Sequence, residues 1–403
     1  LKFSGAAILW HSRTSSGRYV TSERVVVRVS ILRAIAIMCS QRMDDGTRMH
    51  RNCDISQEEI GEVAAAFAHG FDSDAYDRMA ADGQRVSQYA KAIQGAVLGK
   101  TVLDVGTGRD ALLARLCIVA GAAHVTAVEV VPSVAAEARS AIASVSLAGR
   151  VDVLTGFSAN TALPKVDLVV HEIVGGLAME EGMASVLLDL QRRPEVVDAS
   201  RPGWSIPRHV ETRVAPIALA DEFSAADCSV GAVGRGAVMS WATVERLHVD
   251  RLVHVPAPAA TQLLGALQVL DSLDIEMPLE PQLVQQRQMT WICDRRAMLT
   301  GFACAPWLDL DGQHSVDAWL GGTNWPHKLA GLESPVSVGP GDEVVLCAEI
   351  DLRHFPVEYT FSVELRRATS VALHEPLKRL ARAATIGDAL EIRQARQDAI
   401  AVG

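Results

Sequence analysis

The sequence predicts an α/β fold: a doubly wound domain on a parallel sheet, followed by an antiparallel β-barrel or β-sandwich domain. Three observations support this prediction. The length of 403 residues suits two domains better than one. From about residue 100 to 193, short apolar runs alternate with helical patterns, which is typical of βα units. After the segment "RPGWSIPRH" the runs become strand-like and are separated by Gly, Pro and Asp.

Composition narrows the class of protein. Hydrophobic residues make up 49% and charged residues 21%, a balance typical of a folded globular chain. The net charge of -10 argues against a nucleic-acid partner and favours cationic ones. No apolar stretch reaches the length of a membrane span. None of the seven cysteines forms a CxxC pair, so we expect neither a metal site nor a disulfide framework. The protein is therefore expected in a reducing compartment, the cytoplasm.

The ends of the chain lack the signals of the middle. Residues 1–55 carry no clear fold signal and are expected to be unassigned or disordered. Organisation begins with a serine-capped helix over about 56–71 and a second helix over about 75–96. Residues 368–403 have a helical pattern with a basic face.

The first domain, over 56–193, reads as alternating elements. Strands are expected at "TVLDVG", "HVTAVEV", "VDVLTG" and "VDLVVHE". Helices are expected at "ALLARLCIVAGA", closed by Gly121, and at "SVAAEARSAIASVSLAG". Continuous apolar strands of this kind are buried on both faces of a parallel sheet.

The second domain, over 194–367, reads as strands such as "VETRVAPIAL", "SPVSVGPGDEVVLCAEI" and "VEYTFSVEL". An inserted arm is expected at about 221–273. It starts with an Ala-, Ser- and Gly-rich stretch and continues as a helical segment to about Leu273.

The segment "VLDVGTGRD" lies where a strand turns into a helix. Gly106 and Gly108 allow the backbone to approach a ligand closely, and Asp104 precedes them. One strand later, Glu129 can accept hydrogen bonds from ribose hydroxyls. The pattern predicts a nucleoside ligand, with NAD and S-adenosylmethionine as candidates. The DxGxG form resembles the turn of class I methyltransferases rather than the dinucleotide pattern GxGxxG.

Four segments between about Ala75 and Leu365 resemble, in the same order, segments of the protein arginine methyltransferases. The cofactor domain of that family is Rossmann-like. One of these segments is the DxGxG turn followed by Glu129. Another is "MAADGQRVSQYAKAI", which matches at Met79, Asp82, Arg85, Tyr89, Ala92 and Ile93. The resemblance implies S-adenosyl-L-methionine as cofactor, with Arg85 binding its carboxylate. It also implies a homodimer formed through the arm.

The segment "VDLVVHEIVGGLAMEEGM" resembles the double-glutamate loop of that family. The resemblance implies that Glu172 and Glu181, nine residues apart, hold a guanidinium. A guanidinium is always charged and a poor nucleophile, so two carboxylates can fix its plane and localise its charge. Glu180 is expected to be a solvated neighbour. Met79 and Met183 match positions that crowd the acceptor nitrogen.

The last matching segment, "GGTNWPHKLAGLESPVSVGPGDEV", resembles the Thr-His-Trp loop of the family. Trp325 would line the acceptor channel, and Asn324 stands where the family has histidine. Other positions also depart from the pattern. Asp110 replaces a glycine of the turn, and Ala159 replaces an adenine-binding glutamate. Ser158 could substitute as a hydrogen-bond partner of the cofactor.

The resemblance implies methylation of arginine in a protein or peptide. Free arginine or another small guanidine is an alternative acceptor, because both need the same two glutamates. A second alternative is a catalytically impaired member that acts as a binding partner, given Asp110, Ala159 and Asn324. A dehydrogenase would need a catalytic group near the sheet edge, and His171 is the nearby candidate. We expect His171 instead to be a structural histidine whose hydrogen bonds are satisfied.

Overall fold

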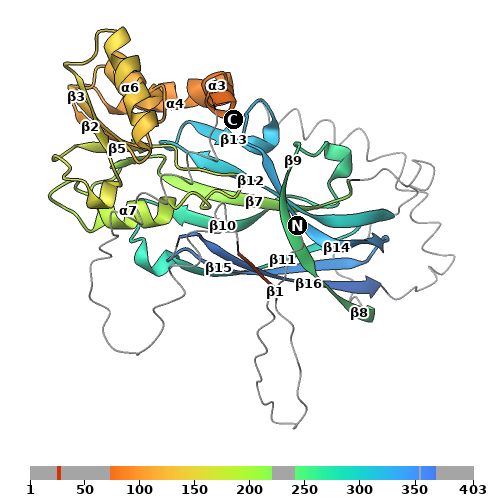
Figure 1. The fold of residues 1–403 in the computed structure, drawn as a ribbon. Coiled ribbons are helices and arrows are strands. Elements are labelled where there is room, and N and C mark those ends of the chain that lie inside the picture. Colours follow the sequence, from red (N-terminus) through yellow and green to blue (C-terminus); the bar gives the residue numbers. More distant parts are fainter. Residues whose placement is uncertain (1–24, 29–72, 220–240, 354, 369–403) are drawn as a thin grey trace, which may run out of the picture.

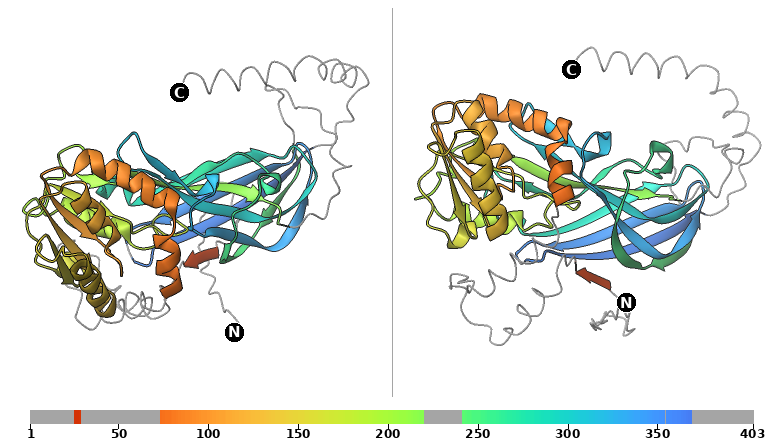
Figure 2. Two further views of the ribbon diagram at one scale, coloured as in Figure 1. Left: turned by 90° about the horizontal axis from the view of Figure 1, so that it is seen from above. Right: turned by 45° about the horizontal axis from the view of Figure 1, so that its top comes forward.

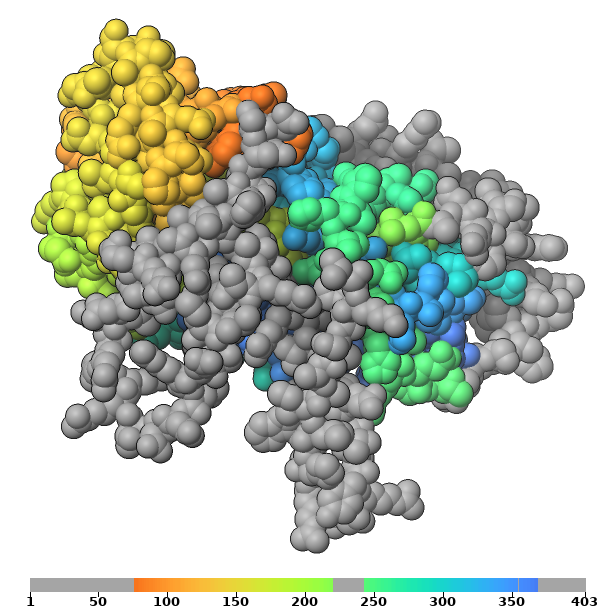
Figure 3. Space-filling view, in the orientation of Figure 1, coloured from red at the N-terminus to blue at the C-terminus, as the bar shows by residue number. Residues whose placement is uncertain are grey.

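The computed structural model describes residues 25–28, 73–219, 241–353 and 355–368. An α/β domain adjoins an elongated β domain (Figure 1). The space-filling view shows the two as adjoining masses (Figure 3). Helices α3 (Ser73–Ala80) and α4 (Gly83–Ala96) lie near β13 (Ser315–Asp317) of the β domain (Figure 2).

The α/β domain contains a five-stranded parallel sheet in the order β4-β3-β2-β5-β6. The strands are β2 (Thr101–Val105), β3 (His124–Glu129), β4 (Val151–Thr155), β5 (Leu168–His171) and β6 (Ser205–Ile206). The helices after them are α5 (Leu112–Val119), α6 (Pro132–Ser144) and α7 (Met183–Gln191). The predicted strands and helices of this sheet are therefore confirmed.

The chain reverses direction in the middle of this sheet. From β2 it runs through α5 and α6 toward one edge, and it then returns to the other side of β2 at β5. Right-handed crossovers place α5 and α6 on one face and α7 on the other, so the sheet is doubly wound. The reversal places a topological switch point at the carboxyl ends of β2 and β5, where α/β sheets bind ligands.

The single helix expected over 75–96 is wrong, because the chain breaks between α3 and α4. Asp82 lies at the break and is the N-cap of α4. Its Oδ1 accepts a hydrogen bond of 3.0 Å from the backbone N–H of Arg85. An aspartate favours this N-cap position over a helix interior.

The β domain consists of two antiparallel sheets, as predicted. One has the order β10-β7-β12-β14-β9, with β13 on β12. The other has the order β1-β16-β15-β11, with β8 on β16. The strands not yet given are β7 (His209–Ile217), β8 (Trp241–Leu247), β9 (Val249–Val255), β10 (Gln268–Asp274), β11 (Val284–Ile292), β12 (Ala297–Asp309), β14 (His327–Val338), β15 (Glu343–Asp351) and β16 (Glu358–Ala368).

Two further expectations need correction. The helical segment expected up to Leu273 is wrong, because β8, β9 and β10 occupy that part of the chain. Valines recur along "WATVERLHVDRLVHV", and β-branched residues favour a strand over a helix. The N-terminal segment, for which no fold was expected, contributes β1 (Val25–Arg28), which pairs with β16.

Several expectations fall outside the described residues. These are the helix over 56–71, the start of the arm at 221–238 and the helical C-terminal tail after Ala368. Within the described ranges, no helix is long and apolar enough to cross a membrane.

One hydrophobic core runs through both domains. Trp204, fully enclosed beside β6, donates its indole N–H to the backbone oxygen of Ile275 at 3.0 Å. Gln191 of α7 bonds to Met277 at 3.1 Å and to Leu279 at 2.9 Å. The domains therefore share a packed and hydrogen-bonded interface.

Candidate active site

The predicted site residues cluster at the carboxyl ends of three neighbouring strands. Gly106 follows β2, Glu129 ends β3, and Glu172 follows β5. These three strands are adjacent in the sheet, with β2 in the middle. The switch point of the sheet and the predicted site residues therefore coincide.

Glu129 and the glycine turn form one local unit. Oε2 of Glu129 accepts a hydrogen bond of 3.1 Å from the backbone N–H of Gly108, and Oε1 accepts one of 2.9 Å from that of Val131. Gly106 and Gly108 have φ values of 75° and 66°, a region that favours glycine. Each carboxylate oxygen keeps a further lone pair for a ligand hydroxyl. Burial raises the pKa of Glu129.

Asp104 lies beneath the turn, fully buried. Its Oδ2 accepts the hydroxyl of Thr107 at 2.6 Å and the N–H of Ala114 at 3.0 Å. Burial raises its pKa to about 7. Asp104 was predicted to bind cofactor, and in the structure it braces the turn and the start of α5.

Ser158 lies in η1 (Ser158–Asn160), with 3% of its surface exposed. Its backbone oxygen accepts a hydrogen bond of 2.9 Å from Arg193. This oxygen also accepts the backbone N–H of Thr161 at 3.3 Å, so its partners lie in its own turn and just after α7, and not in the glycine turn.

Arg85 joins the helix α4 to the loop after β5. Its Nη1 donates to Oε1 of Glu172 at 2.6 Å, and its Nη2 donates to the backbone oxygen of Met79 at 2.5 Å. The guanidinium carbon lies 5.4 Å from the ring centroid of Trp325, a cation–π distance. The cluster therefore brings together four residues that the sequence singled out.

The loop before β14 closes this cluster. Trp325 donates its indole N–H to the backbone oxygen of Val174 at 2.9 Å. Asn324 donates its backbone N–H to Oδ2 of Asp82 at 2.8 Å, and its side-chain amide donates to the backbone oxygen of Arg78. Asn324 thus contacts Asp82 through the main chain, so the connection does not depend on the missing histidine.

Glu181 is partly buried, one residue before the N-cap Gly182 of α7. Burial, with the charges of Glu180 and Glu172, raises its pKa to about 8. Burial also raises the pKa of Glu172, against the charge of Arg85. The charge of Glu172 thus acts on Glu181, from the strand end that precedes its loop. Met183, just beyond them, is fully buried.

Glu180 was expected to be solvated, and that expectation is wrong. Only 4% of the residue is exposed. Its Oε1 accepts the backbone N–H of Gly176 at 2.7 Å, and Nζ of Lys328 lies 3.0 Å from its Oε2. A lysine far along the chain neutralises the carboxylate, which is why local sequence did not reveal its burial.

Tyr76 is a residue that the sequence reasoning missed. A Cβ added to Gly108 would lie 3.3 Å from its ring, and the guanidinium of Arg109 lies 5.6 Å from the ring centroid. Burial and the charge of Glu129 raise the pKa of its phenol, with a smaller effect from Glu181. Tyr76 therefore lies against the glycine turn. Its position one helical turn before Met79 was the available signal.

Asp110 is partly exposed and paired. Nη2 of Arg109 lies 3.3 Å from Oδ2 of Asp110 and 2.5 Å from Oδ1 of Asp77. A neighbouring cation thus offsets the carboxylate that replaces a glycine of the family turn.

His171 differs from its expected role as a satisfied histidine. It is fully buried, and neither ring nitrogen has a hydrogen-bond partner among the described residues. Burial lowers its pKa to about 3, so the ring is neutral at physiological pH.

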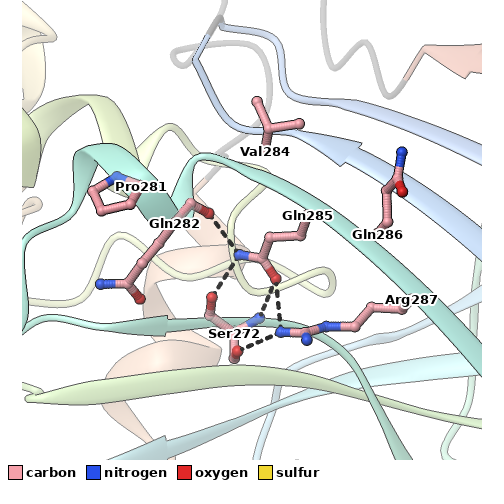
Figure 4. A pocket seen from close by; sticks show the side chains of 7 residues that line it. All are labelled: Ser272, Pro281, Gln282, Val284, Gln285, Gln286 and Arg287. Carbon is pink, nitrogen blue, oxygen red and sulfur yellow. Dashed lines mark hydrogen bonds between the residues drawn. The ribbon is translucent and has the colours of Figure 1, made fainter.

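Other features lie apart from this site. A cavity of about 290 Å³ between β10 and β11 is lined by residues such as Ser272, Gln285 and Arg287, none of them predicted site residues (Figure 4). Gln285 bonds to both of the others, which uses much of their polar capacity. Within the described ranges, no group of three His, Cys, Asp or Glu residues could hold a metal ion.

No known family profile and no curated protein matches this chain. Solved structures do. A complex from Trypanosoma brucei, described as a PRMT1 enzyme–prozyme heterotetramer with AdoHcy, aligns with a TM-score of 0.53 and 20% identity, covering 68% of this chain and 87% of that one. Protein arginine methyltransferase 10 of Arabidopsis thaliana aligns with a TM-score of 0.57 and 19% identity, covering 75% and 98%. This chain therefore has the fold of these arginine methyltransferases.

Proposed function

We propose that this protein is an S-adenosylmethionine-dependent methyltransferase whose acceptor is a guanidinium held between Glu172 and Glu181. The observation that carries the proposal is the Arg85–Glu172 contact of 2.6 Å, at the edge where Glu129 ends its strand and at the start of the loop that leads to Glu181. The shared fold with arginine methyltransferases, one of them described with AdoHcy, supports it.

The residues present fit this cofactor. Glu129 has free lone pairs for the ribose hydroxyls, and its carboxylate is held in place by two backbone N–H groups. Arg85 has five N–H donors, of which the contacts to Glu172 and Met79 use two, so it can also bind a carboxylate. When bound, S-adenosylmethionine supplies an electrophilic methyl group.

The protein's own residues orient the acceptor. Glu172 and Glu181 would each accept N–H bonds from the guanidinium and draw its charge toward the nitrogens that they contact. The remaining nitrogen would keep electron density for the methyl group that the cofactor would supply, and the proton that this nitrogen loses would pass to solvent or to a carboxylate. Orientation and preorganised charge thus provide most of the rate enhancement.

Calorimetric titration with S-adenosylmethionine and S-adenosylhomocysteine tests the cofactor. We expect micromolar dissociation constants for both compounds. A second assay compares arginine-rich peptides with free arginine as methyl acceptors, and we expect transfer to the peptides. Transfer to free arginine alone would show that the acceptor is a small guanidine and not an arginine of a protein or peptide. A folded protein that binds neither compound would contradict the proposal and favour a non-catalytic binding partner. Sedimentation of the same sample tests the predicted homodimer.

A further inference from the structure

Glu180, the carboxylate next to the proposed catalytic Glu181, is buried where its loop contacts β14 of the β domain. Its side chain keeps 3% of its surface exposed, and that of Lys328 keeps 10%. Nζ of Lys328 lies 3.0 Å from Oε2 of Glu180. Oε1 of Glu180 accepts the backbone N–H of Gly176 at 2.7 Å, so the carboxylate folds back on its own loop.

Two glycines make room for this arrangement. A Cβ added at Gly175 would collide with the Glu180 side chain. A Cβ added at Gly176 would lie 2.9 Å from Cγ of Lys328 and 2.8 Å from the backbone oxygen of Pro326. Since real Cβ atoms do not approach this closely, the loop admits the pair only because both residues are glycine.

The lysine comes from a well-supported strand. Lys328 of β14 is paired in register with Cys304 of β12 on one side and His254 of β9 on the other. A second hydrogen bond anchors the same loop to the β domain, from the N–H of Ala178 to Oγ1 of Thr212 at 2.9 Å. The loop that carries Glu181 is therefore held by strands of the other domain.

We propose that the Glu180–Lys328 pair is a positioning device for Glu181: the β domain grips one carboxylate so that the next residue presents its carboxylate to the acceptor. This inference rests on the proposed function. Neither Glu180 nor Lys328 touches the acceptor. They act by fixing the backbone between residues 180 and 181 and by setting the charge around the working carboxylate.

The charges around Glu181 predict the direction in which its pKa changes when Glu180 or Lys328 is substituted. Glu180 and Glu172 raise its pKa, while Lys328 and Arg85 lower it. Tyr76 is affected by the Glu181 charge in turn. Removing the lysine should therefore raise the pKa of Glu181, whereas neutralising Glu180 should lower it.

The experiment compares Lys328→Met, Glu180→Gln and the double variant Glu180→Gln/Lys328→Met, with Lys328→Arg as the conservative change. The double variant matters because a single buried charge left without a partner can unfold the protein. Lys91→Met, at an exposed position on α4, controls for loss of a lysine. Two quantities are measured: the pH profile of kcat/KM, and the titration of Glu181 by carboxylate ¹³C NMR, with Glu181→Gln used for assignment.

We expect Lys328→Met to lower kcat roughly tenfold to a hundredfold through misplacement of Glu181. It should also shift the Glu181 titration upward by about one pH unit, and Glu180→Gln should shift it downward. The double variant should lie between them, and Lys328→Arg should keep the wild-type titration.

Two results would overturn the inference: an unmoved Glu181 titration in both single variants, or shifts in the same direction. The NMR titration needs no turnover. A wild-type protein that transfers no methyl but shows opposite shifts would therefore contradict the proposed function while supporting the positioning role.

Discussion

The two halves of the proposed site are built differently. On the nucleoside side, Glu129 is held by backbone N–H groups of Gly108 and Val131, from the same pair of βα units. On the acceptor side, Glu172 and Glu180 are held by Arg85 and Lys328, from a helix before the sheet and from the β domain. The first half is local, and the second depends on how distant parts of the chain meet.

This difference has a functional meaning. A carboxylate held by backbone donors keeps its geometry when surface side chains change, because the turn itself supplies the donors. Carboxylates held by charged side chains are sensitive to each partner. Variants should therefore separate the two halves, with changes in cofactor affinity on one side and changes in turnover on the other.

Glu181→Gln is expected to show the largest difference between its effect on turnover and its effect on cofactor affinity. The amide keeps the volume but loses the charge that localises the guanidinium, so kcat should fall roughly a thousandfold. The affinity for S-adenosylhomocysteine, measured by calorimetry, should stay unchanged. Glu333→Gln, at an exposed position on β14, is the matched control. Near-normal turnover would remove Glu181 from the site.

The pH dependence of turnover follows from the same residue. Glu181 must be ionised to hold the guanidinium, and its pKa is raised to about 8. The value of kcat/KM should therefore rise by roughly tenfold per unit below pH 8 and level off above it. A profile that is flat from pH 6 to 9 would contradict the assignment.

Stability should change in the opposite sense. A carboxyl group whose pKa is higher in the folded state favours folding below its unfolded pKa, and this contribution is lost as the pH rises through about 8. The melting temperature should thus decrease between pH 6 and 8, and less so in Glu181→Gln. This check is independent of any substrate.

Glu172→Gln should affect both halves, because Glu172 also holds Arg85. We expect turnover to fall about a hundredfold and the dissociation constant of S-adenosylhomocysteine to rise about tenfold, as the loss of one charge-assisted bond implies. Paired calorimetry and initial-rate measurements would detect this. An effect on turnover alone would show that Arg85 keeps its position without Glu172.

Glu129→Ala should act on the nucleoside side only. The loss of carboxylate hydrogen bonds should weaken cofactor binding roughly tenfold to a hundredfold. At saturating cofactor, kcat should remain near the wild-type value. An unchanged dissociation constant would remove Glu129 from the ribose site.

The smallest effect is expected for Asp110→Gly, which restores the glycine of the family turn. Asp110 is partly exposed and already paired with Arg109. Such pairs contribute little, so the dissociation constant should change by less than about threefold. A gain of tenfold or more would show that Asp110 impairs the cofactor site.

The sequence predicted what is encoded locally. The parallel sheet, the glycine turn and Glu129 follow from apolar runs and nearby residues, and the structure contains them. It did not predict the break at Asp82, because the same pattern also suits a continuous helix. Strands β8 and β9 were missed because their apolar residues recur largely every third position, as at Val249, Leu252 and Val255, a spacing that also suits a helix.

The burial of Glu180 was beyond the reach of local reasoning. Its partner Lys328 lies in another domain, and a lysine on a strand gives no sign of what it faces. The signal that could have been used is the pair Gly175 and Gly176, which lies in the same loop as the two adjacent glutamates. Adjacent glycines indicate that something must approach the backbone closely.

The shared core has a consequence for cutting the chain. Trp204 and Gln191 bond across the boundary, and the hydrophobic cluster passes through it without a gap. A fragment that ended near Arg193 would expose apolar surface normally covered by the strands after it. The sheet that resembles a minimal methyltransferase is thus not a free-standing module, and heating should melt the intact protein in one calorimetric transition.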